Sequence, residues 1–197
     1  MTGVGAVSRM ARVEAGATVA VIGCGAVGLN ALQGAALAQA AQVIAIERDP
    51  MRETLARTFG ASHFIASGAG DEIARVRALT AGRGADYVFE SAGSEATLQL
   101  GLEITRPGGQ MVILGKTAVN QMVSLRFGSM MGGKRIVRSS YGGARPQRDF
   151  PWLAQAYLDG KLKLDQLISQ RLPLDRINEG FDAMRRGEIV RAVVMLP

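Results

Sequence analysis

The sequence predicts an α/β fold, a doubly wound parallel sheet followed by a C-terminal tail of helix and strand. Three observations lead to this prediction. Apolar runs of strand length alternate with segments of helical periodicity, the connections between them are short, and a glycine-rich turn follows the first strand. Strands that alternate with helices in this way run parallel, and the crossover helices cover both faces of the sheet.

The first strand is expected at residues 18–22, where β-branched and apolar residues run between glycines. The same pattern predicts further strands, and helical periodicity falls between them. The further strands are expected at residues 42–46, 63–66, 86–89 and 111–114 and within residues 135–141, and the helices at residues 2–13, 26–39, 50–59, 72–80 and 95–105.

Local signals support the ends of these helices. Pro50 suits the first turn of a helix, and Gly60 suits its end. Asp71 and Glu72 lie where a helix N-terminus favours negative charge. Pro107 and the two glycines after it should close the helix before the fifth strand.

Residues 144–197 are expected to form a separate tail. Pro151 should open a helix that stops at Gly160, and Asp175 should cap a second helix that ends near Arg185. A last strand is expected at residues 190–196. The helices of this tail have apolar faces, so the tail is expected either to be disordered or to pack against other structure.

The composition excludes several classes of site. The chain has 197 residues, of which 48% are hydrophobic and 20% charged, as is typical of a globular protein. Cys24 and His63 are the only cysteine and histidine, so no internal disulfide and no Cys/His zinc site can form. A Ser-His-Asp triad could use only His63.

A long uncharged run, residues 15–46, could be mistaken for a membrane span. Polar residues and glycines interrupt it, so a buried strand, helix and strand are expected and no membrane contact. The first ten residues lack the apolar region of a secretory signal. With a single cysteine, a reduced, cytoplasmic setting is the expectation.

The chain is basic, with a formal net charge of +6. Residues 104–148 contain no acid, and a solvated basic face or a small anionic ligand or partner would explain this. Only Phe127 and Tyr141 could stack on bases there, so nucleic acid is not expected as a partner.

The motif Gly23-Cys24-Gly25-Ala26-Val27-Gly28 predicts a dinucleotide site. The first glycine allows a tight turn, the second lets a pyrophosphate approach the backbone, and the third lets helix and strand pack closely. The helix N-terminus then offers free N–H groups to the phosphates. Residues 1–143 are therefore expected to form a Rossmann-type dinucleotide-binding domain.

An acidic residue, Glu47, ends the second strand, where a carboxylate can accept both ribose hydroxyls of the adenosine. It would repel a 2′-phosphate, so NAD is expected in preference to NADP. Arg48 could partly offset that repulsion. Arg52 either reaches the same ribose or is a surface charge.

Cys24 and His63 each have a functional and a structural interpretation. A thiol at a helix N-terminus can be redox-active, but a small filler in the phosphate loop is the expectation for Cys24. His63 begins a short strand with no partner motif nearby and is expected to be structural.

Nearly the whole chain resembles the C-terminal, cofactor-binding part of the zinc-type medium-chain alcohol dehydrogenases, and most closely the benzyl alcohol and thiol-adduct formaldehyde dehydrogenases. The resemblance rests on the dinucleotide loop and its preceding strand and on five shorter segments. These are Thr2-Gly-Val-Gly-Ala6, Phe59-Gly-Ala61, Gly84-Ala-Asp86, Arg106-Pro-Gly-Gly109 and Ile177-Asn-Glu-Gly-Phe181.

The resemblance implies further cofactor contacts. Glu47 stands where the family usually has an aspartate on the adenosine ribose, and Arg52 matches a basic residue near it. The other matching residues lie along the adenine, nicotinamide and pyrophosphate. They are Thr2 on the nicotinamide ring, Ser91 and Ala92 on the adenine and nicotinamide-ribose side, Leu114, Gly115 and Lys116 on the carboxamide, Tyr141 beside the nicotinamide, and Arg191 on the pyrophosphate.

The family's zinc ligands and proton relay have no counterpart in this sequence. In the family they lie in an N-terminal domain, on which the tail packs, so zinc is expected only there and no catalytic residue is expected here. The resemblance also implies a homodimer through the sheet edge near Gln121 to Ser129.

Three functions are therefore considered. The first is the NAD(H)-binding part of an alcohol or aldehyde oxidoreductase. The second is a non-catalytic dinucleotide-binding module or truncated pseudoenzyme, and the third is a zinc-free quinone or enoyl reductase relative.

Overall fold

The computed structural model describes residues 1–196. They form two compact units, one covering Met1–Phe150 and the other beginning at Pro151. Each unit has its own sheet.

The first unit is built on a six-stranded sheet whose neighbouring strands are all parallel, in the order β3-β2-β1-β4-β5-β6. This confirms the predicted fold class, because it is the strand order of the Rossmann arrangement. The strands are β1 (Thr18–Ile22), β2 (Gln42–Glu47), β3 (His63–Ala66), β4 (Ala85–Glu90), β5 (Thr105–Ile113) and β6 (Arg135–Arg138).

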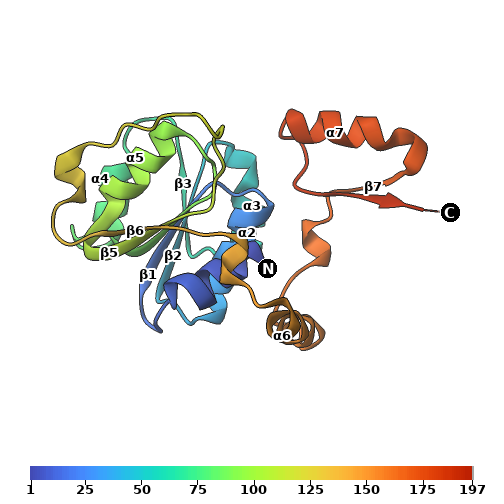
Figure 1. Ribbon diagram of the computed structural model, residues 1–197, viewed down its shortest axis with the longest axis horizontal. Coiled ribbons are helices and arrows are strands. Elements are labelled where there is room, and N and C mark those ends of the chain that lie inside the picture. The colour runs from blue at the N-terminus through green and yellow to red at the C-terminus, as the bar shows by residue number, and fades with distance from the viewer. Residues whose placement is uncertain (197) are drawn as a thin grey trace. The chain divides into compact units, whose positions relative to one another are not determined.

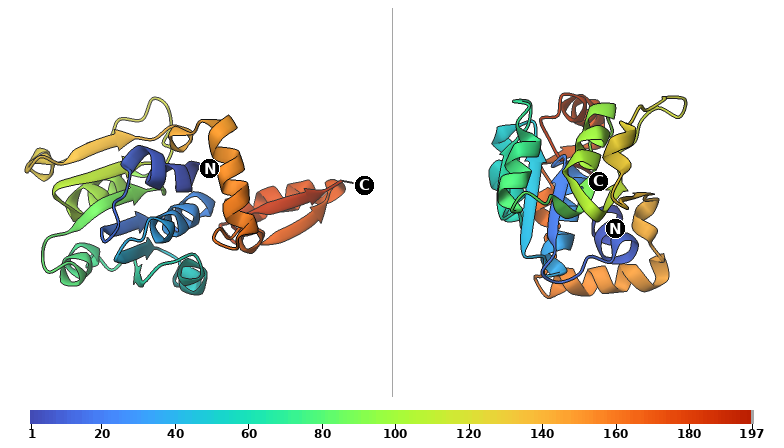
Figure 2. Two further views of the ribbon diagram at one scale, coloured as in Figure 1. Left: turned by 90° about the horizontal axis from the view of Figure 1, so that it is seen from below. Right: turned by 90° about the vertical axis from the view of Figure 1, so that its left-hand side faces the viewer.

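Helices cover both faces of this sheet (Figure 1; Figure 2). The helices α2 (Ala26–Leu37) and α3 (Glu53–Thr58) lie on one face, and α4 (Glu72–Leu79) and α5 (Glu95–Ile104) on the other. All five residues of β1 are buried, as expected for a central strand covered on both sides. Large side chains that are fully buried, among them Phe59, Phe89 and Leu102, fill the layers between helices and sheet.

The uncharged run at residues 15–46 forms β1, α2 and most of β2, as expected. None of the helices within residues 1–196 has both the length and the apolar character that a membrane crossing requires.

The N-terminal helix departs from the prediction. A short α-helix, α1 (Thr2–Gly5), continues as a π-helix over Ala6–Ala11, and Arg12 ends it in the left-handed conformation with a φ of 52°. Small residues let this segment lie directly on α2. A Cβ on Gly3 would overlap the carbonyl oxygen of Val27, and a Cβ on Gly34 would lie 3.1 Å from the Cα of Val4.

The connection from β5 to β6 is long and contains no α-helix. Its one regular element is a 3-10 helix at Phe127–Met130. The predicted dimer segment, Gln121 to Ser129, therefore lies outside the sheet, and β6 is the edge strand on this side. The expectation that this segment forms a sheet edge is wrong for the single chain.

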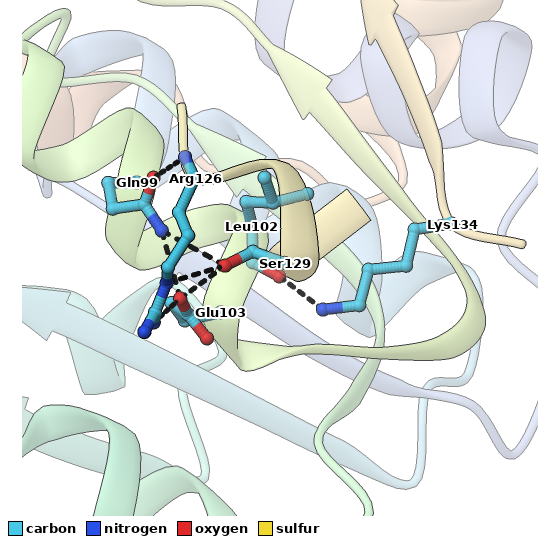
Figure 3. Close-up of polar contacts among 6 residues, drawn as sticks. All are labelled: Gln99, Leu102, Glu103, Arg126, Ser129 and Lys134. Atoms are coloured by element: carbon cyan, nitrogen blue, oxygen red, sulfur yellow. Dashed lines mark hydrogen bonds and ion pairs between the residues drawn. The ribbon is translucent and has the colours of Figure 1, made fainter. Parts of the chain in front are cut away.

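Side-chain bonds pin the connection to α5 (Figure 3). Glu103 forms an ion pair with Arg126 and accepts a hydrogen bond from the hydroxyl of Ser129. The amide oxygen of Gln99 accepts the backbone N–H of Arg126 at 3.0 Å, and its amide nitrogen donates to Glu103 at 2.9 Å. The loop is thus held in one position over the helix.

A second anchor lies at the other end of the same connection (Figure 3). The ammonium of Lys134 donates to the carbonyl oxygen of Leu102 at 2.6 Å, at the C-terminal end of α5. Burial lowers the pKa of Lys134, although the nearby Glu103 opposes this effect.

The helix predicted from Pro151 begins earlier, because α6 spans Pro146–Leu158 and holds Pro151 inside it. Pro146 also suits a first turn, and the carboxylate of Asp149 accepts the backbone N–H of Arg145 at 2.8 Å, which satisfies one free donor at the helix start.

The second unit contains a two-stranded parallel sheet of β7 (Gln170–Pro173) and β8 (Ala192–Met195), with α7 (Ile177–Arg185) packed on it. A Cβ on Gly180 would lie 2.7 Å from the side chain of Leu172, so this glycine permits the close packing. Strand β7 was not expected. The predicted cap at Asp175 is wrong, since a 3-10 helix at Leu174–Arg176 precedes α7 and Arg176 is the N-cap.

Candidate functional site

The glycine-rich turn joins β1 to α2 at the carboxyl edge of the sheet. Strand order reverses between β1 and β4, and such switch points are where open α/β sheets bind ligands. Gly23 has a φ of 90°, which side-chain-bearing residues rarely adopt. A Cβ on Gly28 would overlap the carbonyl oxygen of Gly23 and lie 2.8 Å from the hydroxyl of Ser91. These two glycines are therefore required by the turn itself.

Gly25 differs from the other two glycines of the motif. It is the N-cap of α2, with no side-chain cap bond, and a Cβ built on it would meet no atom within 4 Å. Protein packing therefore does not explain a glycine at this position. Open space in front of an uncapped helix N-terminus is the geometry that suits a phosphate group.

Glu47 ends β2 beside the same turn, as expected. One carboxylate oxygen accepts the backbone N–H of Cys24 at 2.6 Å, and the other accepts the N–H groups of Arg48 and Asp49 at 2.8 Å and 3.1 Å. The carboxylate is thus held at the mouth of the turn.

Arg52 also lies against the turn. Its guanidinium donates to the carbonyl oxygen of Cys24 at 3.1 Å and lies 3.7 Å from the carboxylate of Asp49. The structure therefore brings Arg52 to the predicted ribose side, where Arg48 contributes a backbone contact to Glu47.

The thiol of Cys24 is buried, and burial, reinforced by the charge of Glu47, raises its pKa to about 12. A protonated, inaccessible thiol fits the filler role and is a poor nucleophile. His63 lies at the start of β3, where its Nδ1 is 2.9 Å from the hydroxyl of Ser62.

Ser91 and Ala92 follow β4, on the opposite side of the switch point from Glu47. The Ser91 hydroxyl donates to the carbonyl oxygens of Ile22 and Gly23 at 2.9 Å and 3.0 Å. It therefore ties the ends of β1 and β4 together.

Sequence reasoning missed Glu90, the last residue of β4. It is fully buried, and one carboxyl oxygen accepts from the backbone N–H groups of Ala92 and Gly93 at 2.9 Å and 2.6 Å and from the hydroxyl of Thr97 at 2.8 Å. The sequence shows only an acid directly after the apolar residues 86–89, and its burial, which makes it need several donors, comes from the structure.

Glu90 also organises the loop after β5. Its backbone carbonyl accepts the N–H groups of Leu114 and Gly115 at 2.7 Å and 2.9 Å. A Cβ on Gly115 would lie 2.6 Å from the second carboxyl oxygen of Glu90, which has no hydrogen-bond partner within the described residues. A Cβ on Gly93 would lie 2.6 Å from the carbonyl oxygen of Lys116. The loops after β4 and β5 are thus packed backbone to backbone.

The remaining expected contacts divide between the two units. Thr2 begins α1, and its carbonyl oxygen would lie 2.7 Å from a Cβ on Gly142, so it packs on the turn that contains Tyr141. Tyr141 is half exposed, with a φ of 51°. Arg191 belongs to the second unit, where its carbonyl oxygen accepts the N–H of Ser169 at 2.9 Å. Their contacts with a cofactor stay predictions.

Within residues 1–196, no group of three or more His, Cys, Asp and Glu side chains could hold a metal ion. A cavity of about 560 Å³ lies between the loop after β5 and the strands β5 and β6. Apolar side chains such as Leu98, Val123 and Leu125 dominate its walls.

Residues 26–159 match the family described as zinc-binding dehydrogenase. The chain is 36% identical, over 98% of its length, to a probable S-(hydroxymethyl)glutathione dehydrogenase of Schizosaccharomyces pombe, and 38% identical, over 99%, to a class-3 alcohol dehydrogenase of Myxine glutinosa. It covers 51% and 52% of those proteins, so it spans about half the length of the curated relatives it matches.

Solved structures give the same picture. Benzyl alcohol dehydrogenase from Acinetobacter calcoaceticus superposes with a TM-score of 0.94 at 28% identity, over all of this chain and 54% of that one. An alcohol dehydrogenase zinc-binding domain protein from Burkholderia ambifaria also has a TM-score of 0.94, at 33% identity, over all of this chain and 53% of that one.

Proposed function

The chain belongs to the zinc-binding dehydrogenase family, and on that premise we propose that it holds NAD(H) for hydride transfer to or from a primary alcohol or aldehyde. It is the dinucleotide-binding part of such an oxidoreductase and spans about half of its relatives' length. The activity belongs to a whole protein in which a further domain supplies the zinc and the proton relay.

One observation carries the proposal. Gly28 is required by packing inside the turn, whereas the space in front of Gly25 is open and faces an uncapped helix. The first backbone N–H groups of α2 would hold the pyrophosphate, and Glu47 would accept the hydroxyls of the adenosine ribose. The backbone of Leu114 to Lys116 would meet the carboxamide. When bound, the dinucleotide supplies the group that carries the hydride.

NAD is preferred over NADP in this proposal. The carboxylate of Glu47 is held at the turn by three backbone N–H groups, so it cannot turn away from a 2′-phosphate without losing them. Arg52 is engaged with Cys24 and Asp49 on the same side and offsets only part of that repulsion.

We further propose a homodimer through the loop that contains Gln121 to Ser129. Four large apolar side chains on or beside this segment are strongly exposed: Val119 at 100%, Met122 at 87%, Phe127 at 75% and Met131 at 63%. Isolated apolar side chains are normal on a surface, but four strongly exposed ones along a single loop favour a partner. The bonds from α5 that pin the loop reduce the ordering that association would need (Figure 3).

The test is a fluorescence titration of the chain with NADH and with NADPH. NADH should bind more tightly than NADPH. Glu47→Ala should weaken NADH binding by about tenfold, since two charge-assisted ribose bonds are lost. The same variant should reduce the difference in affinity between NADH and NADPH. Metal analysis should find no stoichiometric zinc on this chain. A Glu47→Ala variant that binds NADH as tightly as the unaltered chain would refute the assignment of Glu47 to the ribose. Reduction of a quinone with NADPH by the chain alone would favour the quinone or enoyl reductase alternative.

A further inference from the structure

Four arginines converge on a pocket of about 330 Å³ in the first unit that shares no lining residue with the dinucleotide turn. Its lining contains no acidic residue among those that the structure describes. We propose that this arginine pocket binds a small oxyanion of the phosphate class. It is lined by Ser8, Arg9, Arg12, Gly143, Arg145 and Arg148.

Two segments far apart in the sequence build the pocket, and glycines fix their contact. A Cβ on Gly142 would lie 2.7 Å from the carbonyl oxygen of Thr2, and one on Gly143 would lie 2.6 Å from the sulfur of Met10. The turn at residues 141–143 is therefore seated directly on the N-terminal helical segment. As a result, Arg9 and Arg12 from one segment share a pocket with the two arginines that follow the turn.

A single buried carboxylate organises the arginines. The side chain of Asp149 is fully buried, accepts Nε and Nη2 of Arg148 at 2.7 Å and 3.0 Å, and lies 3.1 Å from Nη2 of Arg9. The bonds from Arg148 and the backbone of Arg145, with Arg9 nearby, hold the pKa of Asp149 well below its usual range. Asp149 thus pairs with the guanidiniums of Arg148 and Arg9. Because the pocket has four arginines and one carboxylate beside them, three positive charges are left in excess.

This arrangement selects the ligand chemistry. Guanidinium groups stay charged at all physiological pH values, repel one another, and match tetrahedral oxyanions through paired N–H donors. An anion with two or more negative charges would bridge arginines of both segments and relieve their repulsion. The volume is at the lower end for ligand pockets, which suits a phosphate, pyrophosphate or small phosphate monoester.

The acid-free stretch at residues 104–148 contains both Arg145 and Arg148, and the one acid that pairs with Arg148 is Asp149, directly after the stretch. The small anionic ligand that this stretch suggested would therefore bind in the arginine pocket. It also requires arginines from the N-terminal segment, which lie outside the stretch.

The test is isothermal titration of the chain with sodium pyrophosphate at an ionic strength held constant with sodium chloride. Saturable binding should be seen, and Arg12→Gln or Arg145→Gln should each weaken binding at the arginine pocket by about tenfold. The matched control is Arg75→Gln, which removes an exposed arginine of α4 that does not line the pocket, and it should change the affinity by less than about twofold.

Pyrophosphate could also occupy the start of α2, so each titration is repeated with NADH at saturation. Binding that persists with NADH, with NADH affinity unchanged by Arg12→Gln, supports the arginine pocket. Loss of pyrophosphate binding in the presence of NADH, no saturable binding, or equal weakening by Arg75→Gln would overturn the proposal. Failure of NADH itself to bind would refute the proposed function. The arginine pocket would then be tested by comparing the pyrophosphate affinity of Arg12→Gln with that of the unaltered chain.

Discussion

Two glycines of the same turn should respond oppositely to an added methyl group. In Gly28→Ala the new Cβ would overlap the carbonyl oxygen of Gly23 and lie 2.8 Å from the hydroxyl of Ser91. In Gly25→Ala it would meet nothing within 4 Å, and the backbone, with a φ of −75° and a ψ of −176°, already suits alanine.

The magnitudes follow from these contacts. Overpacking typically costs about 1–3 kcal/mol, and the two bonds from the Ser91 hydroxyl are each worth about 1 kcal/mol, so Gly28→Ala should lower the free energy of unfolding by about 3–5 kcal/mol. That is a large part of a typical margin of about 5–15 kcal/mol. Gly25→Ala should cost no more than about 1 kcal/mol, for a poorer helix cap. Its methyl group enters the proposed pyrophosphate space, so NADH affinity should fall by about tenfold or more.

Urea unfolding followed by far-ultraviolet circular dichroism measures the stability, and NADH fluorescence measures the affinity. The pair separates folding from binding, because each variant should affect mainly one of the two measurements. Gly25→Ala that binds NADH like the unaltered chain would refute the placement of the pyrophosphate. Gly28→Ala with unchanged stability would refute the packing argument.

Three other predictions concern the buried acid, the thiol and the exposed loop. Glu90→Ala should lower the free energy of unfolding by about 3–6 kcal/mol, because three donors lose their acceptor. Glu90→Gln keeps an oxygen for these donors and should cost less. Equal urea midpoints for the two variants would contradict this. Iodoacetamide should alkylate Cys24 slowly at pH 8 in the folded chain and rapidly in urea, as mass spectrometry would show. Since its pKa rises from 9.0 to about 12 on folding, its contribution to stability is complete below pH 9 and falls as the pH rises toward 12. Phe127→Asp should shift the sedimentation coefficient from dimer to monomer, and a dimer that persists at the same concentration would exclude this loop as the interface.

The candidate site was predictable where its chemistry is local. The order of strand, glycine-rich turn, helix and acid-ended strand occurs within one stretch of chain, and the structure brings Gly23, Gly28 and Glu47 together as that order indicates. Helix ends were harder, because Pro146 and Pro151 both suit a first turn. Only the bond between the carboxylate of Asp149 and the backbone of Arg145 favours the earlier start.

The sequence by itself determined the parallel sheet, the position of the dinucleotide turn and the absence of a Cys/His zinc site, because periodicity, glycine spacing and residue counts are properties of the chain alone. Only the tertiary structure decided what the buried acids do. Glu90 joins loops that follow two different strands, and Asp149 faces arginines from segments more than a hundred residues apart in the chain. Burial and the convergence of distant donors give these carboxyl groups their partners, and neither has a local sequence pattern.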